Sequence, residues 1–278
     1  MSYDEVLYDA IDGIATITMN RPEKLNAWTR VMEREVREAM VEASRDEAVR
    51  VIVLGGAGRG FCAGADMSGL SLAGDRATRE SETRRIQAEI GPIPGGLDLP
   101  DDFSHRASYF PTVPKPVIAA VNGPAAGIGM IMALFCDIRL ASQSAFFTTA
   151  FARRGLVAEH GVGWMLTRLI GLQGALDLLL SARRVTAEEA LRLGLVTAVY
   201  PDESFGEQVR AYAETLAKQV SPRSLRVMKQ QLYRGLSQRL SEAIELGYEE
   251  MAASFDSEDF KEGVAHFVEK RPPAFTGR

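Results

Sequence analysis

The sequence predicts an α/β fold that is followed by a helical region at the C-terminus. Strand-like apolar runs alternate with helical patterns along the first 200 residues, an order typical of α/β and mixed folds. After residue 202 the sequence keeps the helical period and shows little strand pattern. A long segment in the middle, 67–113, has no steady period. We therefore expect a core over 1–200 and a helical region over 201–278.

Six strands are expected in the core. The first two flank Asp12-Gly13, a dipeptide that favours a two-residue hairpin turn. Another run, KPVIAAVN, is apolar almost throughout, which indicates a strand buried on both faces. The expected strands cover 5–10, 14–19, 49–55, 115–122, 137–142 and 195–200.

Helices are expected between and after these strands. The unbroken apolar stretch 130–136 is too apolar for a surface helix, so it predicts a helix in the core. Thr186 and Glu189 have the spacing of a capping box, and Ser221-Pro222 is a typical helix start. The other expected helices are 28–44, one that opens from a loop at 154 and ends at Gly171, 203–219, 222–247 and 257–269.

The segment 67–113 carries several glycines and prolines and has one short helical pattern, near 76–90. Long loops of this kind in compact domains are often binding loops. By contrast, Trp164 and Met165 lie in a helical pattern and are interpreted as core residues.

Composition excludes several classes of protein. The 278 residues are 46% hydrophobic, which argues against a largely disordered chain, and the net charge is −5. Nucleic-acid binding depends on Lys and Arg, so an acidic chain without a basic run is a poor candidate for RNA or DNA binding. The two cysteines cannot form a disulfide framework, and with three histidines they show no metal-ligand spacing.

The longest apolar stretch is interrupted by glycines and is shorter than the roughly 20 residues that span a bilayer. The first residues are acidic and do not resemble a signal peptide. We therefore expect a cytoplasmic protein with no membrane segment and no metal.

Two glycine-rich segments, 55–66 and 123–129, each follow an expected strand. Gly58-x-Gly60-x-x-Ala63 approaches a dinucleotide fingerprint, but glycines and a serine interrupt the helix that this fingerprint requires. A tight loop without a ligand remains an alternative. The favoured interpretation is that both loops offer backbone N–H groups to one negative oxygen, the arrangement called an oxyanion hole.

Six motifs in the same order resemble the enoyl-CoA hydratase/isomerase (crotonase) family. They are NRPEKLNAW (20–28), GRGFCAGAD (58–66), KPVIAAVNGPAAGIG (115–129), CDIRLAS (136–142), TAEEALRLGLV (186–196) and EKRPPAFTGR (269–278). The resemblance implies a spiral of repeated ββα units and a C-terminal trimerisation region. It also implies a homotrimer or dimer of trimers, an acyl-CoA thioester substrate and no separate cofactor, since the substrate carries coenzyme A.

The resemblance assigns candidate binding residues by position. The N–H groups of Ala65 and Ile128 would form the oxyanion hole for the thioester oxygen. The residues that would lie along CoA are Lys24, Leu25, Ala63, Ala65 and Asp66. Lys270, with Phe267 nearby, would approach the nucleotide of a neighbouring subunit's CoA. His105 and Tyr109 fall in the segment that would wall the acyl pocket.

The catalytic positions depart from the hydratase pattern. Where hydratases of the family carry two glutamates, this chain has Ile131 and Phe151. Neither side chain can accept a proton or orient water, which hydration requires. Glu159 falls where certain family isomerases carry an acid, and the adjacent His160 is a candidate to assist it. A single carboxylate in an apolar pocket suits a double-bond shift.

Several interpretations stay open. Glu159 could instead be a solvated loop residue, and His160 could simply satisfy backbone groups. The favoured function is isomerisation of an enoyl-CoA by one carboxylate. The alternatives are an enoyl-CoA hydratase in which Glu159 activates water, and a CoA-thioester binder that has lost catalysis. RNA binding, known for some relatives, is disfavoured by the net charge.

Overall fold

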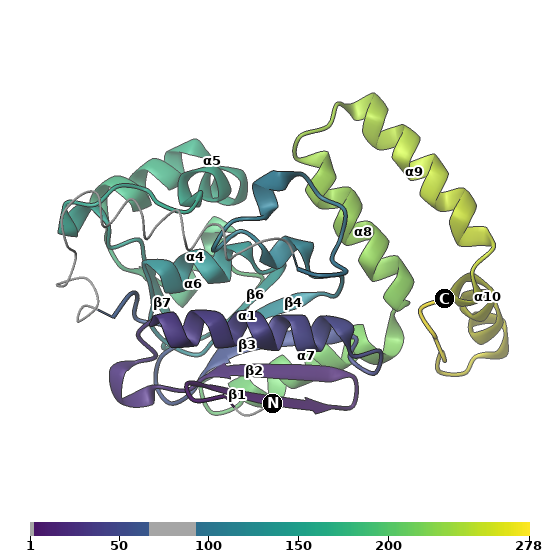
Figure 1. Ribbon diagram of the computed structural model, residues 1–278, viewed down its shortest axis with the longest axis horizontal. Coiled ribbons are helices and arrows are strands. Elements are labelled where there is room, and N and C mark those ends of the chain that lie inside the picture. The colour runs from purple at the N-terminus through teal and green to yellow at the C-terminus, as the bar shows by residue number, and fades with distance from the viewer. Residues whose placement is uncertain (1–2, 67–92) are drawn as a thin grey trace.

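The computed structural model describes residues 3–66 and 93–278, and it confirms the predicted α/β class (Figure 1). The strands are β1 (Val6–Ile11), β2 (Ile14–Met19), β3 (Val51–Gly56), β4 (Val117–Val121), β5 (Ala125–Ala126), β6 (Ile138–Ser142), β7 (Phe146–Thr148), β8 (Val185–Thr186) and β9 (Ala198–Tyr200). The α-helices are α1 (Arg30–Arg45), α4 (Ile128–Phe135), α5 (Val162–Ser181), α6 (Ala187–Leu193), α7 (Phe205–Gln219), α8 (Pro222–Gly235), α9 (Leu240–Phe255) and α10 (Glu258–Glu269). The short helix expected near 76–90 lies outside the described residues.

Six strands form the main sheet in the order β1-β2-β3-β4-β6-β9. Only β1 and β2 pair in antiparallel fashion, through the predicted hairpin, and the other described neighbours in this sheet are parallel. Asp12 and Gly13 have φ of 54° and 81°, as the favoured two-residue turn requires. A smaller sheet has the order β5-β7-β8.

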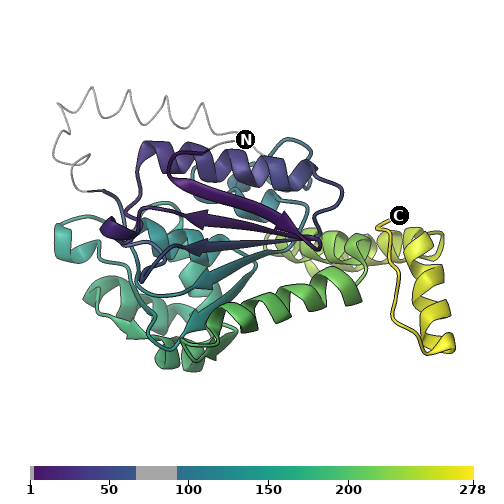
Figure 2. The same ribbon diagram turned by 90° about the horizontal axis from the view of Figure 1, so that it is seen from below.

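Helices cover both faces of the main sheet, with α1 on one face and α7 on the other (Figure 2). Strand β3 explains this arrangement, because its side chains alternate between the two faces. Ile52 and Leu54 belong to the cluster that contains α1, whereas Val51 and Val53 belong to the cluster with α7. The apolar helix α4 is buried along its whole length, as its sequence predicts.

The structure corrects two local predictions and extends a third. The helix expected over 222–247 is two helices, because α8 ends at Gly235 and α9 begins at Leu240. The first helical stretch of α5 ends at Gly171 as predicted, where φ is 73° and ψ is 167°, but a second stretch that was not predicted runs from there to Ser181. Thr186 caps α6, but no full capping box forms. The Glu189 carboxylate binds Arg183 instead, at 2.7 and 2.9 Å.

The C-terminal helices differ in how they pack. Helix α7 lies on the sheet, whereas α9 and α10 extend away from it (Figure 1). The division at residue 200 therefore stays a prediction. Helices α8 to α10 expose large apolar side chains: Met228, Leu232, Leu236, Leu240, Ile244, Tyr248, Met251, Phe255, Phe260, Val264, Phe267 and Val268.

Over residues 3–66 and 93–278, no helix has the length and apolar character needed to cross a bilayer. The same residues contain no group of three or more His, Cys, Asp or Glu side chains arranged to hold a metal ion. Both cysteines are buried free thiols.

Candidate active site

The two glycine-rich segments lie side by side. A parallel bridge pairs Cys62 with Ala125, through hydrogen bonds from Cys62 N to the Pro124 oxygen (3.0 Å) and from Ala126 N to the Cys62 oxygen (2.9 Å). The approach is so close that a Cβ added to Gly129 would lie 2.3 Å from the Cys62 oxygen. The sequence therefore needs glycine at 129 for the two loops to meet.

This pairing brings the two predicted oxyanion-hole donors to equivalent positions. Ala65 and Ile128 each lie three residues after the bridged pair, and Ile128 is the first residue of α4. Gly127 reaches the helix through a φ of 51°, which favours glycine. In the described part of the chain, neither N–H has a hydrogen-bond acceptor. Both groups are therefore available to a ligand oxygen.

Two asparagines hold the first glycine-rich loop in place. The buried Asn26 donates through Nδ2 to the oxygens of Ala57 (2.9 Å) and Gly60 (2.7 Å). Asn122, directly after β4, donates through Nδ2 to the oxygens of Gly56 (2.8 Å) and Gly58 (3.0 Å). These bonds fix the loop that carries Ala65.

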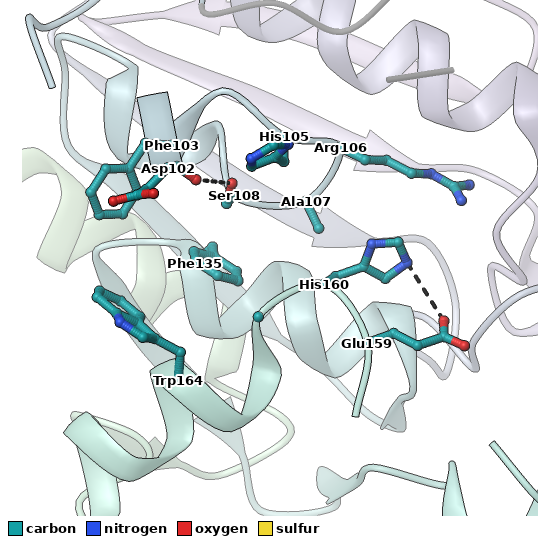
Figure 3. A pocket seen from close by; sticks show the side chains of 11 residues that line it. Asp102, Phe103, His105, Arg106, Ala107, Ser108, Phe135, Glu159, His160 and Trp164 are labelled. Atoms are coloured by element: carbon teal, nitrogen blue, oxygen red, sulfur yellow. Dashed lines mark hydrogen bonds and ion pairs between the residues drawn. The ribbon is translucent and has the colours of Figure 1, made fainter. Parts of the chain in front are cut away.

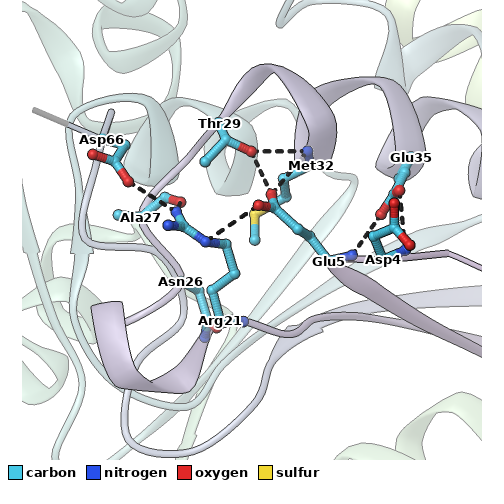
Figure 4. Close-up of polar contacts among 9 residues, drawn as sticks. All are labelled: Asp4, Glu5, Arg21, Asn26, Ala27, Thr29, Met32, Glu35 and Asp66. Atoms are coloured by element: carbon cyan, nitrogen blue, oxygen red, sulfur yellow. Dashed lines mark hydrogen bonds and ion pairs between the residues drawn. The ribbon is translucent and has the colours of Figure 1, made fainter. Parts of the chain in front are cut away.

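Asp66 lies at the end of this loop and forms an ion pair with an arginine. Arg21 contacts it at 3.0 Å and contacts Glu5 at 3.3 Å on its other side (Figure 4). Lys24 is exposed on the short 3-10 helix Pro22–Lys24, and the oxygen of Leu25 accepts a hydrogen bond from Ala63 N at 3.0 Å. The residues of the N-terminal half that were predicted to bind CoA thus lie together at the first glycine-rich loop.

The two predicted residues of the C-terminal region are not part of this group. Phe267 is exposed on α10 and Lys270 is exposed directly after it, at the opposite end of the molecule from the glycine-rich loops (Figures 1 and 2). In one chain they do not reach the CoA residues named above, and their assignment to a neighbouring subunit's CoA stays a prediction.

A pocket of about 680 Å³ opens beside α4 and the start of α5 (Figure 3). Its lining combines aromatic rings with polar side chains. The lining residues are Asp102, Phe103, His105, Arg106, Ala107, Ser108, Phe135, Glu159, His160, Gly161 and Trp164. Residues between 102 and 108 form one wall, and His105 is among them. They belong to the segment 67–113 that was expected to wall an acyl pocket, an assignment that stays a prediction. Tyr109 is buried and lines a small adjoining cavity of about 10 Å³ together with Ile128.

Glu159 and His160 lie together at this pocket. Their closest atoms, Nε2 of His160 and Oε2 of Glu159, are 3.7 Å apart. The Glu159 side chain is 42% exposed, so it stands at the pocket's edge and not in the apolar interior that we expected. The loop before α5 reaches solvent, and this explains the difference.

Burial, together with the smaller effect of the positive charge of Arg106, lowers the pKa of His160 to about 4. The imidazole is therefore neutral at neutral pH. Its contact with Glu159 is a polar contact between a neutral ring and a carboxylate, and no ion pair is needed to explain it. A neutral His160 can donate a hydrogen bond from one ring nitrogen and accept at the other.

The lowered pKa of His160 predicts acid sensitivity. Between its ordinary pKa of 6.5 and about 4, the unfolded chain binds a proton that the folded chain does not. The free energy of unfolding should therefore fall as the pH drops through this window. His160→Gln should remove about 3 kcal/mol of this loss. Chemical denaturation at several pH values measures the difference, and parallel curves for the two proteins would contradict it.

The two hydratase positions contain no acid or base. Ile131 is fully buried in α4, and Phe151 is 8% exposed before α5. Among the described residues, the carboxylates of Glu159 and Asp102 line the pocket itself. Asp102 lies at the other end of the pocket, beside Phe103 (Figure 3).

Several residues that line the pocket were not predicted from the sequence. Trp164 was interpreted as core, but it is 39% exposed and lines the pocket, whereas the adjacent Met165 is buried as predicted. Phe103 and Arg106 come from a segment without a periodic pattern. Arg106 is held by the Glu33 carboxylate of α1, with one contact of 2.5 Å between Nη2 and Oε2. No local signal in the sequence links these two residues.

Comparisons with known proteins place the sequence in a family. The sequence matches the family described as Enoyl-CoA hydratase/isomerase over residues 9–90 and 101–278. It is 38% identical over 278 residues, covering 100% of both chains, to a Rhodobacter capsulatus protein named "Probable enoyl-CoA hydratase". It is 34% identical over 267 residues, covering 96% of both, to the 1,2-epoxyphenylacetyl-CoA isomerase of Escherichia coli K12.

Solved structures show the same fold. A structure titled as enoyl-CoA "hydrates" subunit I, from Geobacillus kaustophilus, matches with a TM-score of 0.87 and 33% identity over 100% of both chains. An enoyl-CoA hydratase from Bacillus anthracis matches with a TM-score of 0.87 and 27% identity, over 99% of this chain and 100% of its own. The crotonase-like fold predicted from the motifs is thereby confirmed, and this chain belongs to the enoyl-CoA hydratase/isomerase family.

Proposed function

We propose that this enzyme moves the double bond of a 3-enoyl-CoA into conjugation with the thioester, using Glu159 as the proton carrier. The observation that carries the proposal is the pairing of a pocket-lining carboxylate with two apolar residues at the hydratase positions. Glu159 lines the pocket, while Ile131 and Phe151 offer no group that could hold water. One base is the minimum that a double-bond shift requires.

The reaction can be written with this chain's groups. Glu159 removes a proton from C2, and the C–H electrons form an enolate whose charge develops on the thioester oxygen. The N–H groups of Ala65 and Ile128 hold that oxygen, which stabilises the enolate. Glu159 then returns the proton to C4, the double bond forms between C2 and C3, and the thioester carbonyl is restored. No water and no cofactor is consumed.

His160 has a supporting role in this proposal. Its neutral imidazole is 3.7 Å from the Glu159 carboxylate, close enough for a small side-chain movement to make a hydrogen bond. Such a bond would orient the carboxylate toward the substrate. His160 does not itself need to change protonation state.

Binding of coenzyme A is proposed at the loop that joins Lys24, Leu25, Ala63, Ala65 and Asp66. The exposed Lys24 ammonium suits a phosphate group. We further propose a homotrimer or dimer of trimers in which Phe267 and Lys270 approach a neighbour's nucleotide. The exposed apolar faces of α8 to α10 support assembly, because monomers rarely leave so many large apolar side chains uncovered.

The relatives favour two different reactions. The Escherichia coli relative is named an isomerase, which supports the proposal, and the Rhodobacter capsulatus relative is named a hydratase. Hydration by Glu159 with His160 assisting is the second candidate. A binder without catalysis is the third, and the loss of both usual glutamates favours it.

One panel of substrates separates these candidates. The enzyme is given 3-enoyl-CoA and 2-enoyl-CoA, and the absorbance of the conjugated thioester is followed. Gain of absorbance from the 3-enoyl compound is the expected result. Loss of absorbance from the 2-enoyl compound would indicate a hydratase. No change with either, while both still bind, would indicate a binder.

A further inference from the structure

The pocket has two chemically different ends. Glu159 and His160 lie at one end, and Phe103 and Trp164 lie at the other (Figure 3). The first end carries the groups that can hold or donate a proton. The second end carries the aromatic rings, with the Asp102 carboxylate and the Ser108 hydroxyl beside them. An acyl chain that places its thioester near the first end would extend its tail toward the second.

Phe103 is held between rings from two different helices. Its ring meets Trp164 of α5 edge-on, at 6.2 Å between centroids and 77° between planes. It meets Tyr233 of α8 in the same manner, at 5.5 Å and 70°. Phe103 is only 4% exposed, although it lines the pocket. Such edge-to-face contacts favour one ring orientation, so Phe103 has little freedom to move aside.

Tyr233 is itself fixed to the sheet. Its hydroxyl donates to Oδ1 of Asp137 at 2.9 Å, and Oδ2 of Asp137 accepts from Val117 N at 2.7 Å. Val117 begins β4, and Asp137 lies just before β6. The ring that supports Phe103 is therefore anchored to two central strands.

The same helix face holds the rest of the pocket wall. One turn before Tyr233, the buried Lys229 donates through Nζ to the oxygens of Phe110 (3.3 Å) and Lys115 (3.0 Å) and contacts Asp137 at 2.7 Å. Next to Tyr233, Arg234 donates through Nε to the Asp98 oxygen at 2.9 Å. Helix α8 thus binds the segment that forms the pocket wall both before and after Phe103 in the sequence.

We infer that Phe103 closes the far end of the acyl pocket and so determines acyl length, and that Tyr233 is a positioning residue that holds Phe103 there. The inference rests on the proposed function in that it takes an acyl-CoA as the ligand. It adds the residue that sets acyl selectivity, and it gives α8 a role at the pocket in addition to assembly.

Binding of saturated acyl-CoA thioesters tests the inference without requiring turnover. Kd is measured by calorimetry for straight-chain probes from butyryl-CoA to hexadecanoyl-CoA. Each methylene that enters the pocket should tighten binding by about fourfold, until the chain reaches Phe103 and the gain stops. In Phe103→Ala the gain should continue for longer chains than in the wild type. Phe103→Leu, a milder change, should extend it less.

Tyr233 is tested through the same series of probes. Tyr233→Ala removes the supporting ring and should extend the gain as Phe103→Ala does, whereas Tyr233→Phe keeps the ring and should restore the wild-type limit. Tyr212→Phe on α7 is the matched control for Tyr233→Phe. It also removes one tyrosine hydroxyl, but Tyr212 packs against the cluster on the other face of the sheet from α1. A purely structural Tyr233 would lower Tm in Tyr233→Ala and leave the chain-length limit where it was.

The outcomes separate this inference from the proposed function. Binding without turnover, with the limit shifted in Phe103→Ala, would sink the isomerase proposal and support the inference. Turnover with an identical chain-length limit in wild type and both Phe103 variants would overturn the inference. Failure of the wild type to bind any of the probes would overturn both.

Discussion

Glu159→Gln should lower the rate of 3-enoyl-CoA isomerisation by about 10²–10⁴-fold, the range that general acid–base groups contribute. Glutamine keeps the size of the side chain and its place at the pocket edge, but it cannot accept a proton from C2. Because the carboxylate acts on the reacting atoms, kcat should fall while Kd for a saturated acyl-CoA stays close to its wild-type value. Stopped-flow absorbance and calorimetry give the two quantities.

Two further variants make this result specific. Glu188→Gln is the matched control, since this side chain is 84% exposed on α6 and does not line the pocket. It should behave as the wild type. Asp102→Asn tests the other pocket carboxylate. If Asp102→Asn abolishes turnover and Glu159→Gln does not, the base is Asp102 and the assignment of Glu159 is wrong.

Gly129→Ala should lower kcat by about 10²–10³-fold, which is the loss that follows removal of one oxyanion-hole donor. The added Cβ would lie 2.3 Å from the Cys62 oxygen and 2.7 Å from the Cys62 Cβ. The two loops must separate to relieve this contact. The N–H of Ile128 then moves away from that of Ala65, and one oxygen can no longer bind both.

The control for this change is another glycine-to-alanine substitution in a helix. Gly206 lies in α7, and no atom lies within 4 Å of the position that its Cβ would take. Gly206→Ala should therefore retain wild-type turnover and a Tm that is unchanged or slightly higher. Folding of Gly129→Ala is checked by circular dichroism. Wild-type kcat in a folded Gly129→Ala protein would refute the account of the oxyanion hole.

The parts of the fold that depend on neighbouring residues were predictable from the sequence. The Asp12-Gly13 turn, strand β4 with its two buried faces and the apolar helix α4 each carry a local pattern that the structure confirms. The two glycine-rich loops carry a local signal too, since glycine is required where two backbones approach closely. Neither segment alone specifies its partner, so their meeting was expected only from the interpretation that both loops serve one oxygen.

The pocket was less predictable because non-local contacts build it. The helical pattern around Trp164 shows that the residue faces other side chains, but not that the partner is Phe103, some 60 positions earlier. The break between α8 and α9 has a local signal in the sequence, which is Gly235, since helices commonly end at a glycine. Glu189 was predicted to complete a capping box with Thr186. Its carboxylate binds Arg183 of the preceding loop instead.

In the proposed reaction one carboxylate moves a double bond and no water is added. Absorbance of the conjugated thioester, together with the mass of the product formed from 3-enoyl-CoA, distinguishes this reaction from hydration. The expected product is a conjugated 2-enoyl-CoA, which gains absorbance at unchanged mass, and Glu159→Gln should form none over the same time. A product heavier by one water molecule, formed by the wild type as the main species, would overturn the proposed reaction.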